Sequence, residues 1–221
     1  MSFGSGSMTN SISEIKDCKL IFLIGGNPTE AHPIVGLEMK KALRKGCTFI
    51  VADPRRIWFA QHAKLYLPVR PGSDNWLLNS MAHVIIAEGL ENKEFIKTRT
   101  EGFEEFKTFV KDITPEKASE YTGIPAEDIR QAARLYATSE KSAVFYTLGI
   151  TEHTCGTDNV RTIANLALLT GHIGKPSTGV NPIRGQNNVQ GATDMGCLPD
   201  RMHGYQYLSD SAVVDKFEKA W

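Results

Sequence analysis

The most concentrated chemistry of the sequence lies between residues 174 and 191. This stretch holds seven side chains with amide, guanidinium or ammonium groups and four glycines. Regular secondary structure cannot satisfy so many polar groups, so the segment favours a ligand-binding surface over an ordinary exposed loop. Arg184 has the group best suited to an anion, because a guanidinium offers paired N–H donors to a carboxylate or phosphate. The alternative is that Arg184 caps the loop.

Acidic residues follow two of the apolar runs in the sequence. Asp53, with Arg55 close behind, comes directly after residues 47–52. An acid at this place suits a nucleotide ribose and an arginine suits phosphate, but an N-capping Asp53 beside a solvated arginine is also compatible. Asp74 ends the turn after residues 64–69. Its carboxylate could take two N–H donors from a guanine edge, although a helix cap needs no ligand and is the simpler interpretation.

Glycines follow two further apolar runs. Gly25 and Gly26 come after one run, and Gly149 comes after residues 142–148. A glycine lets the backbone approach a ligand closely, and a helix that follows offers N–H groups to a phosphate. The same residues suit a plain strand–turn–helix junction. The spacing is not GxGxxG, so the fingerprint typical of NAD-binding proteins is absent here.

The elements that must position these residues alternate along the chain. Short apolar runs predict strands at residues 19–25, 47–52, 64–69 and 142–148. Helical periodicity predicts helices at residues 33–45, 75–88, 93–98, 102–112, 126–139, 157–170 and 211–221, and residues 174–204 read as a long loop. Alternating strands and helices predict an α/β fold, a Rossmann-like parallel sheet with helices on both faces. Ligands of such sheets bind beyond the carboxyl ends of the strands, where these motifs fall.

Composition excludes several classes of function. The 25 basic and 25 acidic residues balance, so no bulk charge attracts nucleic acid or an anionic membrane, and no apolar run is long enough to span a bilayer. The four cysteines have no CxxC spacing, and no set of His, Cys, Asp and Glu has metal-ligand spacing, so we predict no metal ligand in this chain. Scattered cysteines fit a reducing compartment, and we expect a cytoplasmic protein. Residues 1–7 are small and polar and precede a second Met, so we expect a vector-derived tail.

Taken in order, the motifs resemble a known family. They are GGNPxxxHP from Gly25, VADPRR from Val51, PGSDxxLL from Pro71, TLGIT from Thr147 and LTGxIGKPxxGVNPIRGQNNVQG from Leu169. They are similar to molybdopterin-dependent oxidoreductases of the dimethyl-sulfoxide-reductase family, and most similar to its formate dehydrogenase branch. The resemblance covers nearly all of residues 19–221, and its last motif is the most specific.

The resemblance implies a bis(molybdopterin guanine dinucleotide) cofactor that carries molybdenum or tungsten. The residues that it implies as cofactor contacts are Asn27, Glu30, Ala52, Asp53, Arg55, Gly72, Asp74, Leu148, Gly149, Glu152 and Gln186. It implies a catalytic role for Arg184, which would orient formate beside the metal. Glu30 and Glu152 depart from the pattern, since the family has Asp and Gln at these places.

The resemblance also implies that the chain is an internal piece of a larger catalytic subunit. The family's 4Fe-4S cysteines, its cysteine or selenocysteine metal ligand and its C-terminal barrel have no counterpart here. Residues 8–186 would form the Rossmann-like cofactor-binding domain, incomplete at its N-terminal side, and residues 187–221 a loop and helix of the adjacent α/β domain.

The parent enzyme would oxidise formate to carbon dioxide or run the reverse, together with the remaining domains of the subunit and with electron-transfer subunits. We expect the isolated chain to be inactive. Two alternatives stay open: another molybdopterin oxidoreductase such as a nitrate reductase, and a non-catalytic guanine-nucleotide-binding module.

Overall fold

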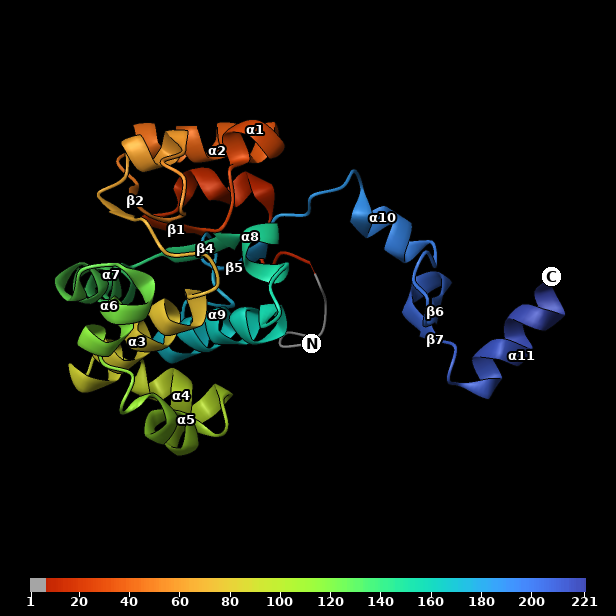
Figure 1. Ribbon diagram of the computed structural model, residues 1–221. Helices are drawn as coiled ribbons and strands as arrows, with labels where there is room; N and C mark the ends of the chain where they lie inside the picture. The colour runs from red at the N-terminus through yellow and green to blue at the C-terminus, as the bar shows by residue number, and fades with distance from the viewer. Residues whose placement is uncertain (1–6) are drawn as a thin grey trace. The chain divides into compact units, whose positions relative to one another are not determined.

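The computed structural model describes residues 7–221, which divide into two compact units, residues 7–183 and Arg184–Trp221 (Figure 1). The division falls at Arg184, against residue 187 in the prediction from sequence. Within the described residues, no helix combines the length and the apolar character needed to cross a membrane.

The first unit is built on a five-stranded sheet. Its strands are β1 Leu20–Ile24, β2 Thr48–Ala52, β3 Leu65–Leu67, β4 Ser142–Tyr146 and β5 Gly179–Pro182. Their order is β3-β2-β1-β4-β5, and every neighbouring pair is parallel. The chain runs outward from β1 to β3 and then returns to place β4 on the other side of β1. Such a reversal leaves a crevice at the carboxyl ends of β1 and β4, where open α/β sheets bind ligands.

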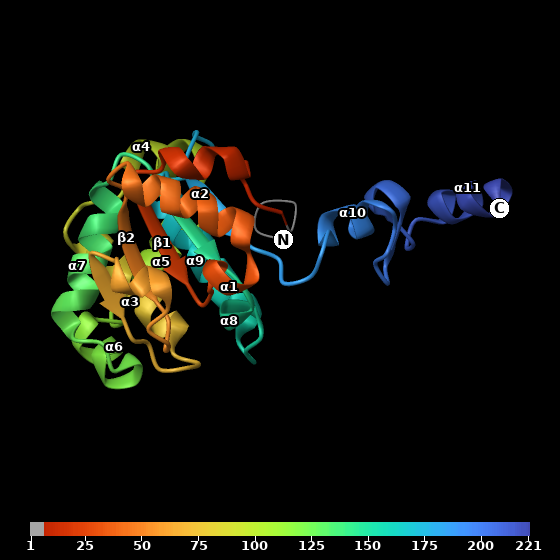
Figure 2. The same ribbon diagram turned by 90° about the horizontal axis from the view of Figure 1, so that it is seen from above.

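Helices cover both faces of the sheet, which confirms the predicted fold class. The helices of this unit are α1 Pro28–Ala31, α2 Pro33–Arg44, α3 Asp74–Ala87, α4 Lys93–Arg99, α5 Phe103–Val110, α6 Pro115–Thr122, α7 Ala126–Thr138, α8 Leu148–Thr151 and α9 Gly156–Thr170, with 3₁₀ turns η1 Ile12–Asp17 and η2 Trp58–Gln61. In Figure 1, α2 lies above the sheet and α3, α7 and α9 lie below it. Seen from above, α2 lies across the strands (Figure 2).

Strands such as β1 are continuous apolar runs because helices pack on both faces of the sheet. Successive side chains of a strand point to opposite faces, so Phe22 and Ile24 enter the core formed with α3, α7 and α9. Ile21 and Leu23 enter the second core, formed with α2. All of β1 is at most 1% exposed, which explains why the run carries no polar residue.

The structure corrects several predicted elements. Strand β5 lies within residues 174–204, which we expected to be a loop, and α1 and α6 were not expected at all. Leu148 does not end a strand but begins the short helix α8. Helix α3 begins at Asp74 itself with Ser73 as its N-cap, so the interpretation of Asp74 as a cap is wrong.

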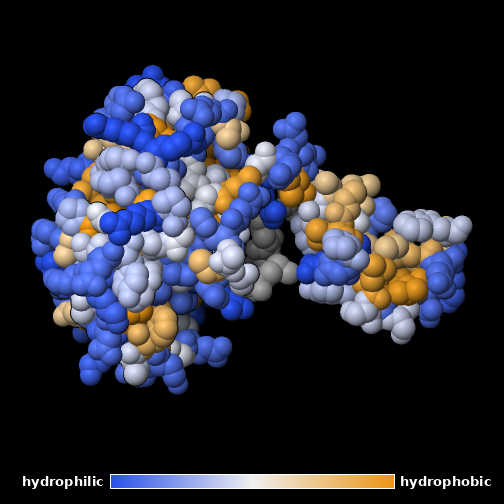
Figure 3. Space-filling model, viewed as in Figure 1, coloured by the Kyte–Doolittle hydropathy of each residue, from blue (hydrophilic) through white to orange (hydrophobic). Residues whose placement is uncertain are grey.

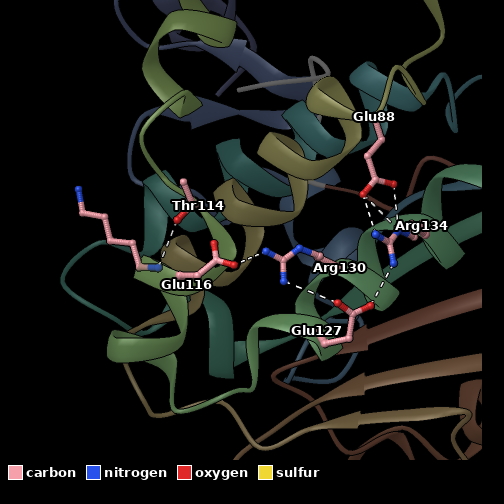
Figure 4. Close-up of polar contacts among 7 residues, drawn as sticks. Glu88, Thr114, Glu116, Glu127, Arg130 and Arg134 are labelled. Atoms are coloured by element: carbon pink, nitrogen blue, oxygen red, sulfur yellow. Dashed lines mark hydrogen bonds and ion pairs between the residues drawn. The ribbon is translucent and has the colours of Figure 1, made fainter.

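An exposed network of ion pairs links α6 and α7 to the end of α3 (Figure 4). Arg134 on α7 lies 2.8 Å from Glu88, just after α3, and 3.0 Å from Glu127. Arg130, one turn earlier on α7, pairs with Glu127 and with Glu116 on α6. Exposed pairs stabilise a protein little, so this network mainly fixes how α6 and α7 align with the end of α3.

The segment before β1 is hydrogen-bonded to β5. The Thr9 N–H donates to the Val180 oxygen at 3.1 Å, and the Val180 N–H donates to the Thr9 hydroxyl at 3.0 Å. Nearby, the Glu14 carboxylate accepts from the Ser177 N–H at 2.8 Å. Hydrogen bonds, the strongest of them from the Asn10 side chain, lower the pKa of Glu14 to about 2. Residues from Thr9 onward are therefore part of the fold.

The second unit is small and contains two helices and a hairpin. Its elements are α10 Val189–Asp194, β6 Arg201–Met202, the 3₁₀ turn η3 His203–Tyr205, β7 Gln206–Tyr207 and α11 Ser211–Ala220. The His203 ring stacks on Phe217 of α11 at 5.8 Å between ring centroids. Apolar surface gathers on this unit in Figure 3, and its exposed large apolar side chains include Met195, Leu208 and Trp221.

Candidate functional site

A cavity of about 400 Å³ opens at the carboxyl ends of β1, β2, β3 and β4. Its walls come from the four segments that directly follow these strands. The predicted cofactor contacts that line it are Asn27, Glu30, Asp53, Arg55, Asp74 and Gly149. Gly25, Gly26, Thr147 and His153 complete most of the wall. The parallel topology thus brings together residues that lie as far apart in the chain as Gly25 and His153.

The floor of the cavity is backbone. The Gly149 N–H donates to the Gly25 oxygen at 3.2 Å, and the Thr147 hydroxyl donates to the same oxygen at 2.8 Å. A Cβ added to Gly149 would lie 2.6 Å from the Gly25 oxygen, far inside van der Waals contact. Only glycines allow the loops after β1 and β4 to meet so closely, and they leave peptide groups accessible to a ligand.

Asp53 lies at the tip of β2 and is 5% exposed. Its carboxylate accepts the Arg55 N–H at 2.8 Å, which closes the turn after the strand. Burial raises the pKa of Asp53, and its contacts with Arg55 oppose that rise. No helix begins at Asp53, since the next turn of helix is η2 with Ile57 as its N-cap, so the capping interpretation is wrong.

Asp74 is the more isolated of the two buried carboxylates. It is 3% exposed, and burial raises the pKa of its carboxyl group above the usual range. The His153 Nε2 lies 3.8 Å from the Asp74 Oδ2, and the same Nε2 lies 2.9 Å from the Gly149 oxygen. The first turn of α3 and the segment after β4 are therefore linked across the cavity by one imidazole.

The hydrogen-bonding groups of the cavity define what it can hold. Asn27 Oδ1 is buried and accepts no hydrogen bond from any described residue. With the carboxylates of Asp53 and Asp74 it makes a set of acceptors that suits N–H and O–H donors, such as a purine edge and a ribose. Arg55 adds a cationic group that suits a phosphate. The cavity therefore fits a nucleotide whose base carries N–H donors.

The structure leaves other predicted residues outside this wall. Ala52 is fully buried, and its oxygen accepts the Gly25 N–H at 3.0 Å. Gly72 lies in the turn before α3 with open space around its Cα. Leu148 begins α8 and Glu152 follows its end, both exposed. Arg184 and Gln186 belong to the second unit.

The two polar side chains of the wall that come from the segment after β4, Thr147 and His153, were not identified from the sequence. Both lie in the segment after β4, but the sequence does not show which side chains of that segment point into the cavity. The signal for His153 is its place four residues after Gly149, because one turn of α8 returns its ring to the Gly149 oxygen.

A second cavity of the first unit is lined by none of the predicted site residues. A cavity of about 500 Å³ between α3, α5 and α9 is lined largely by apolar groups, among them Trp76 and Phe106. In the part of the chain that the structure describes, no three His, Cys, Asp or Glu side chains gather as metal ligands would.

Comparisons with known proteins identify the family of the chain. The family model described as molybdopterin oxidoreductase matches residues 2–218, which include most of the tail that we expected to be vector-derived. Formate dehydrogenase H of Escherichia coli is 49% identical over 220 residues, which are 100% of this chain and 31% of that protein. The alpha subunit of F420-dependent formate dehydrogenase 1 of Methanococcus maripaludis is 48% identical over 99% of this chain and 32% of its own.

A solved structure shares the fold. Acetylene hydratase from Pelobacter acetylenicus superposes with a TM-score of 0.69 and 28% sequence identity, over 75% of this chain and 25% of that one. The present chain spans about a third of the length of the curated relatives that it matches.

Proposed function

Since the chain belongs to the molybdopterin oxidoreductase family, we propose that it is a segment of the catalytic subunit of a formate dehydrogenase. Its role in the subunit is to bind the guanine end of a bis(molybdopterin guanine dinucleotide) cofactor. The observation that carries this proposal is the meeting of three acceptors, Asn27, Asp53 and Asp74, in one cavity with a glycine floor. A guanine nucleotide brings the matching donors.

Each acceptor has a partner on such a nucleotide. The Asp74 carboxylate accepts the ring N–H and the amino group of guanine, and Asp53 accepts ribose hydroxyls. Arg55 faces a phosphate, and Asn27 with Glu30 closes the wall beside α1. The backbone at Ala52 and Gly72 completes the nucleotide contacts, as the resemblance implies.

The pterin part of the cofactor extends toward the segment after β4. By the resemblance, Leu148, Gly149, Glu152 and Gln186 would be the residues that hold it. When bound, the cofactor's molybdenum or tungsten supplies the redox chemistry that interconverts formate and carbon dioxide. Arg184 holds the formate carboxylate with paired N–H donors and fixes its orientation.

The longer protein supplies what this chain lacks. We propose that a 4Fe-4S cluster and the metal's protein ligand lie in other domains of the same subunit. Electron-transfer subunits bind this catalytic subunit, and the enzyme is cytoplasmic. The isolated chain alone is inactive.

Two measurements test the proposal. The chain is titrated with GDP and with ADP, and the full-length protein is assayed for bound pterin and metal and for formate-dependent dye reduction. We expect the chain to prefer GDP and the full-length protein to oxidise formate. Formate-dependent dye reduction by the isolated chain would contradict its inactivity. Nitrate reduction without formate oxidation would favour the nitrate reductase alternative, and GDP binding without any redox activity would favour a nucleotide-binding module.

A further inference from the structure

His153 joins two walls of the cavity that different strands provide. Its Nε2 lies 2.9 Å from the Gly149 oxygen, and since a carbonyl oxygen only accepts, Nε2 carries a proton. The same atom lies 3.8 Å from the Asp74 Oδ2. The His153 side chain is 27% exposed and lines the cavity. The Gly149 oxygen therefore fixes the imidazole ring at a place in the cavity wall where the ring faces Asp74.

Asp74 has few groups that favour its ionised form. Its own backbone N–H and His153 lower the pKa of its carboxyl group, while burial, which dominates, and the charge of Asp53 raise it. The other charged side chains that line the cavity are Glu30 and Arg55. Among the described residues, His153 has the only basic side chain within ion-pair distance of the Asp74 carboxylate.

The ionisation of Asp74 decides which purine the cavity selects. An ionised carboxylate has two acceptor oxygens, which match the ring N–H and the amino group of guanine. Adenine offers an acceptor beside its amino group at the corresponding edge. A protonated carboxyl, with one donor and one acceptor, matches adenine instead.

We propose that His153 is a positioning residue that holds the Asp74 carboxylate ionised and oriented, and thereby sets the preference of this cavity for guanine over adenine. This inference rests on the proposed function, because it assigns the base that Asp74 contacts. It adds a residue that neither the motifs nor the resemblance assigned.

The test is a binding titration of the whole chain with GDP and with ADP between about pH 5 and about pH 8. His153→Phe keeps a ring in place but removes the N–H. We expect it to raise the Kd for GDP about five- to tenfold, the scale of one charge-assisted contact, and to leave the Kd for ADP within about twofold. The pH at which half of the GDP affinity is lost should move upward. A residue with only a structural role would not move that midpoint.

Two further variants serve as a partial replacement of His153 and as a control outside the cavity. His153→Gln retains an N–H for the Gly149 oxygen but lacks the imidazole ring, so it should recover part of the affinity but not the pH midpoint. His62→Gln, at an exposed histidine outside the cavity, should have the same GDP affinity and the same pH midpoint as the unmodified chain. Circular dichroism of each variant establishes that it is folded.

The outcomes separate the inference from the proposed function. Equal GDP affinity and an unchanged pH midpoint in His153→Phe would overturn the inference, while loss of GDP binding in Asp74→Asn would still support the nucleotide site. If the unmodified chain shows no preference for GDP over ADP, the proposed site and the role of His153 are both wrong.

Discussion

Gly149 and Gly25 meet backbone to backbone at the point where β4 and β1 end, with the Gly149 N–H donating to the Gly25 oxygen at 3.2 Å. This contact places the two loops that floor the cavity and leaves no room for a side chain on either residue. The shape of the cavity therefore depends on two positions that contribute no side-chain chemistry.

Replacement of Gly149 by alanine should destabilise the protein and weaken GDP binding together. The new Cβ would lie 2.6 Å from the Gly25 oxygen, so the backbone must shift. Overpacking of this kind costs about 2–3 kcal/mol of unfolding free energy, measured by urea denaturation. Gly89→Ala is the control, because Gly89 has a positive φ but open space around it, and it should cost about 1 kcal/mol without affecting GDP. Equal losses in both variants, with GDP binding kept, would show that the contact does not shape the site.

Removal of the Asp74 charge should abolish the preference for GDP while it stabilises the fold. The raised pKa of Asp74 means that folding disfavours its ionised form, so the ionised group costs stability above its pKa. We expect Asp74→Asn to raise the unfolding free energy at about pH 8 by about 1 kcal/mol, as happens where a site trades stability for function. Asp112→Asn, at an exposed position, should change neither property. A less stable Asp74→Asn protein would indicate that the carboxylate is structural.

His172 should make stability depend on pH. It is 4% exposed, its Nε2 donates to the Tyr136 oxygen at 3.0 Å, and its buried Nδ1 has no partner among the described residues. Burial lowers the pKa of His172 from 6.5 to about 4. Below pH 6.5 the unfolded chain binds a proton that the folded chain does not. The contribution of neutral His172 to the free energy of unfolding is therefore complete above pH 6.5. It declines as the pH falls toward 4, and the total loss is about 3 kcal/mol.

The measurement is urea denaturation at about pH 7 and about pH 4.5. His172→Gln should show a smaller loss between the two conditions than the unmodified chain, because glutamine binds no proton. His62→Gln should lose as much as the unmodified chain. The same loss in all three proteins would assign the acid sensitivity to other groups.

Arg184 should affect formate turnover in the full-length enzyme. Formate has almost no apolar surface, so a paired charge contact must hold it. Truncation of one side of such a pair costs about 2–5 kcal/mol, so Arg184→Ala should lower kcat/KM on the order of 30- to several-thousand-fold. Arg184→Lys should recover only part of it, since an ammonium lacks the fork of donors. Kinetics and bound metal are measured in the same preparation, and parallel loss of cofactor would place Arg184 in cofactor binding instead.

The sequence predicts the fold best where a segment is buried on both faces. Residues 20–24 and 48–52 are continuous apolar runs, and the structure makes both of them strands. Strand β5, with the sequence Gly-Val-Asn-Pro, has no such run and is a strand because it pairs with β4. That pairing depends on residues about 36 positions away, which local periodicity does not report.

The candidate site was predictable in part for a similar reason. Asn27, Asp53 and Asp74 follow successive strands, so a parallel sheet brings them to one end whatever their exact contacts are. The cap assigned to Asp74 was wrong by one residue, because Ser73 holds that place and its hydroxyl donates to the Arg70 oxygen instead. The link between His153 and Asp74 depends on side-chain direction across the cavity, which spacing in the sequence does not give.

The two hydrogen bonds between Thr9 and Val180 bear on how copies of the chain behave toward one another. β5 is the last strand of its sheet, and without residues 7–18 its outer peptide groups would be unpaired. An unpaired edge strand is a template for another chain, so copies shortened past Thr9 would tend to associate edge to edge and aggregate. The segment before β1 thus protects solubility, and any shortened form of the protein should retain it.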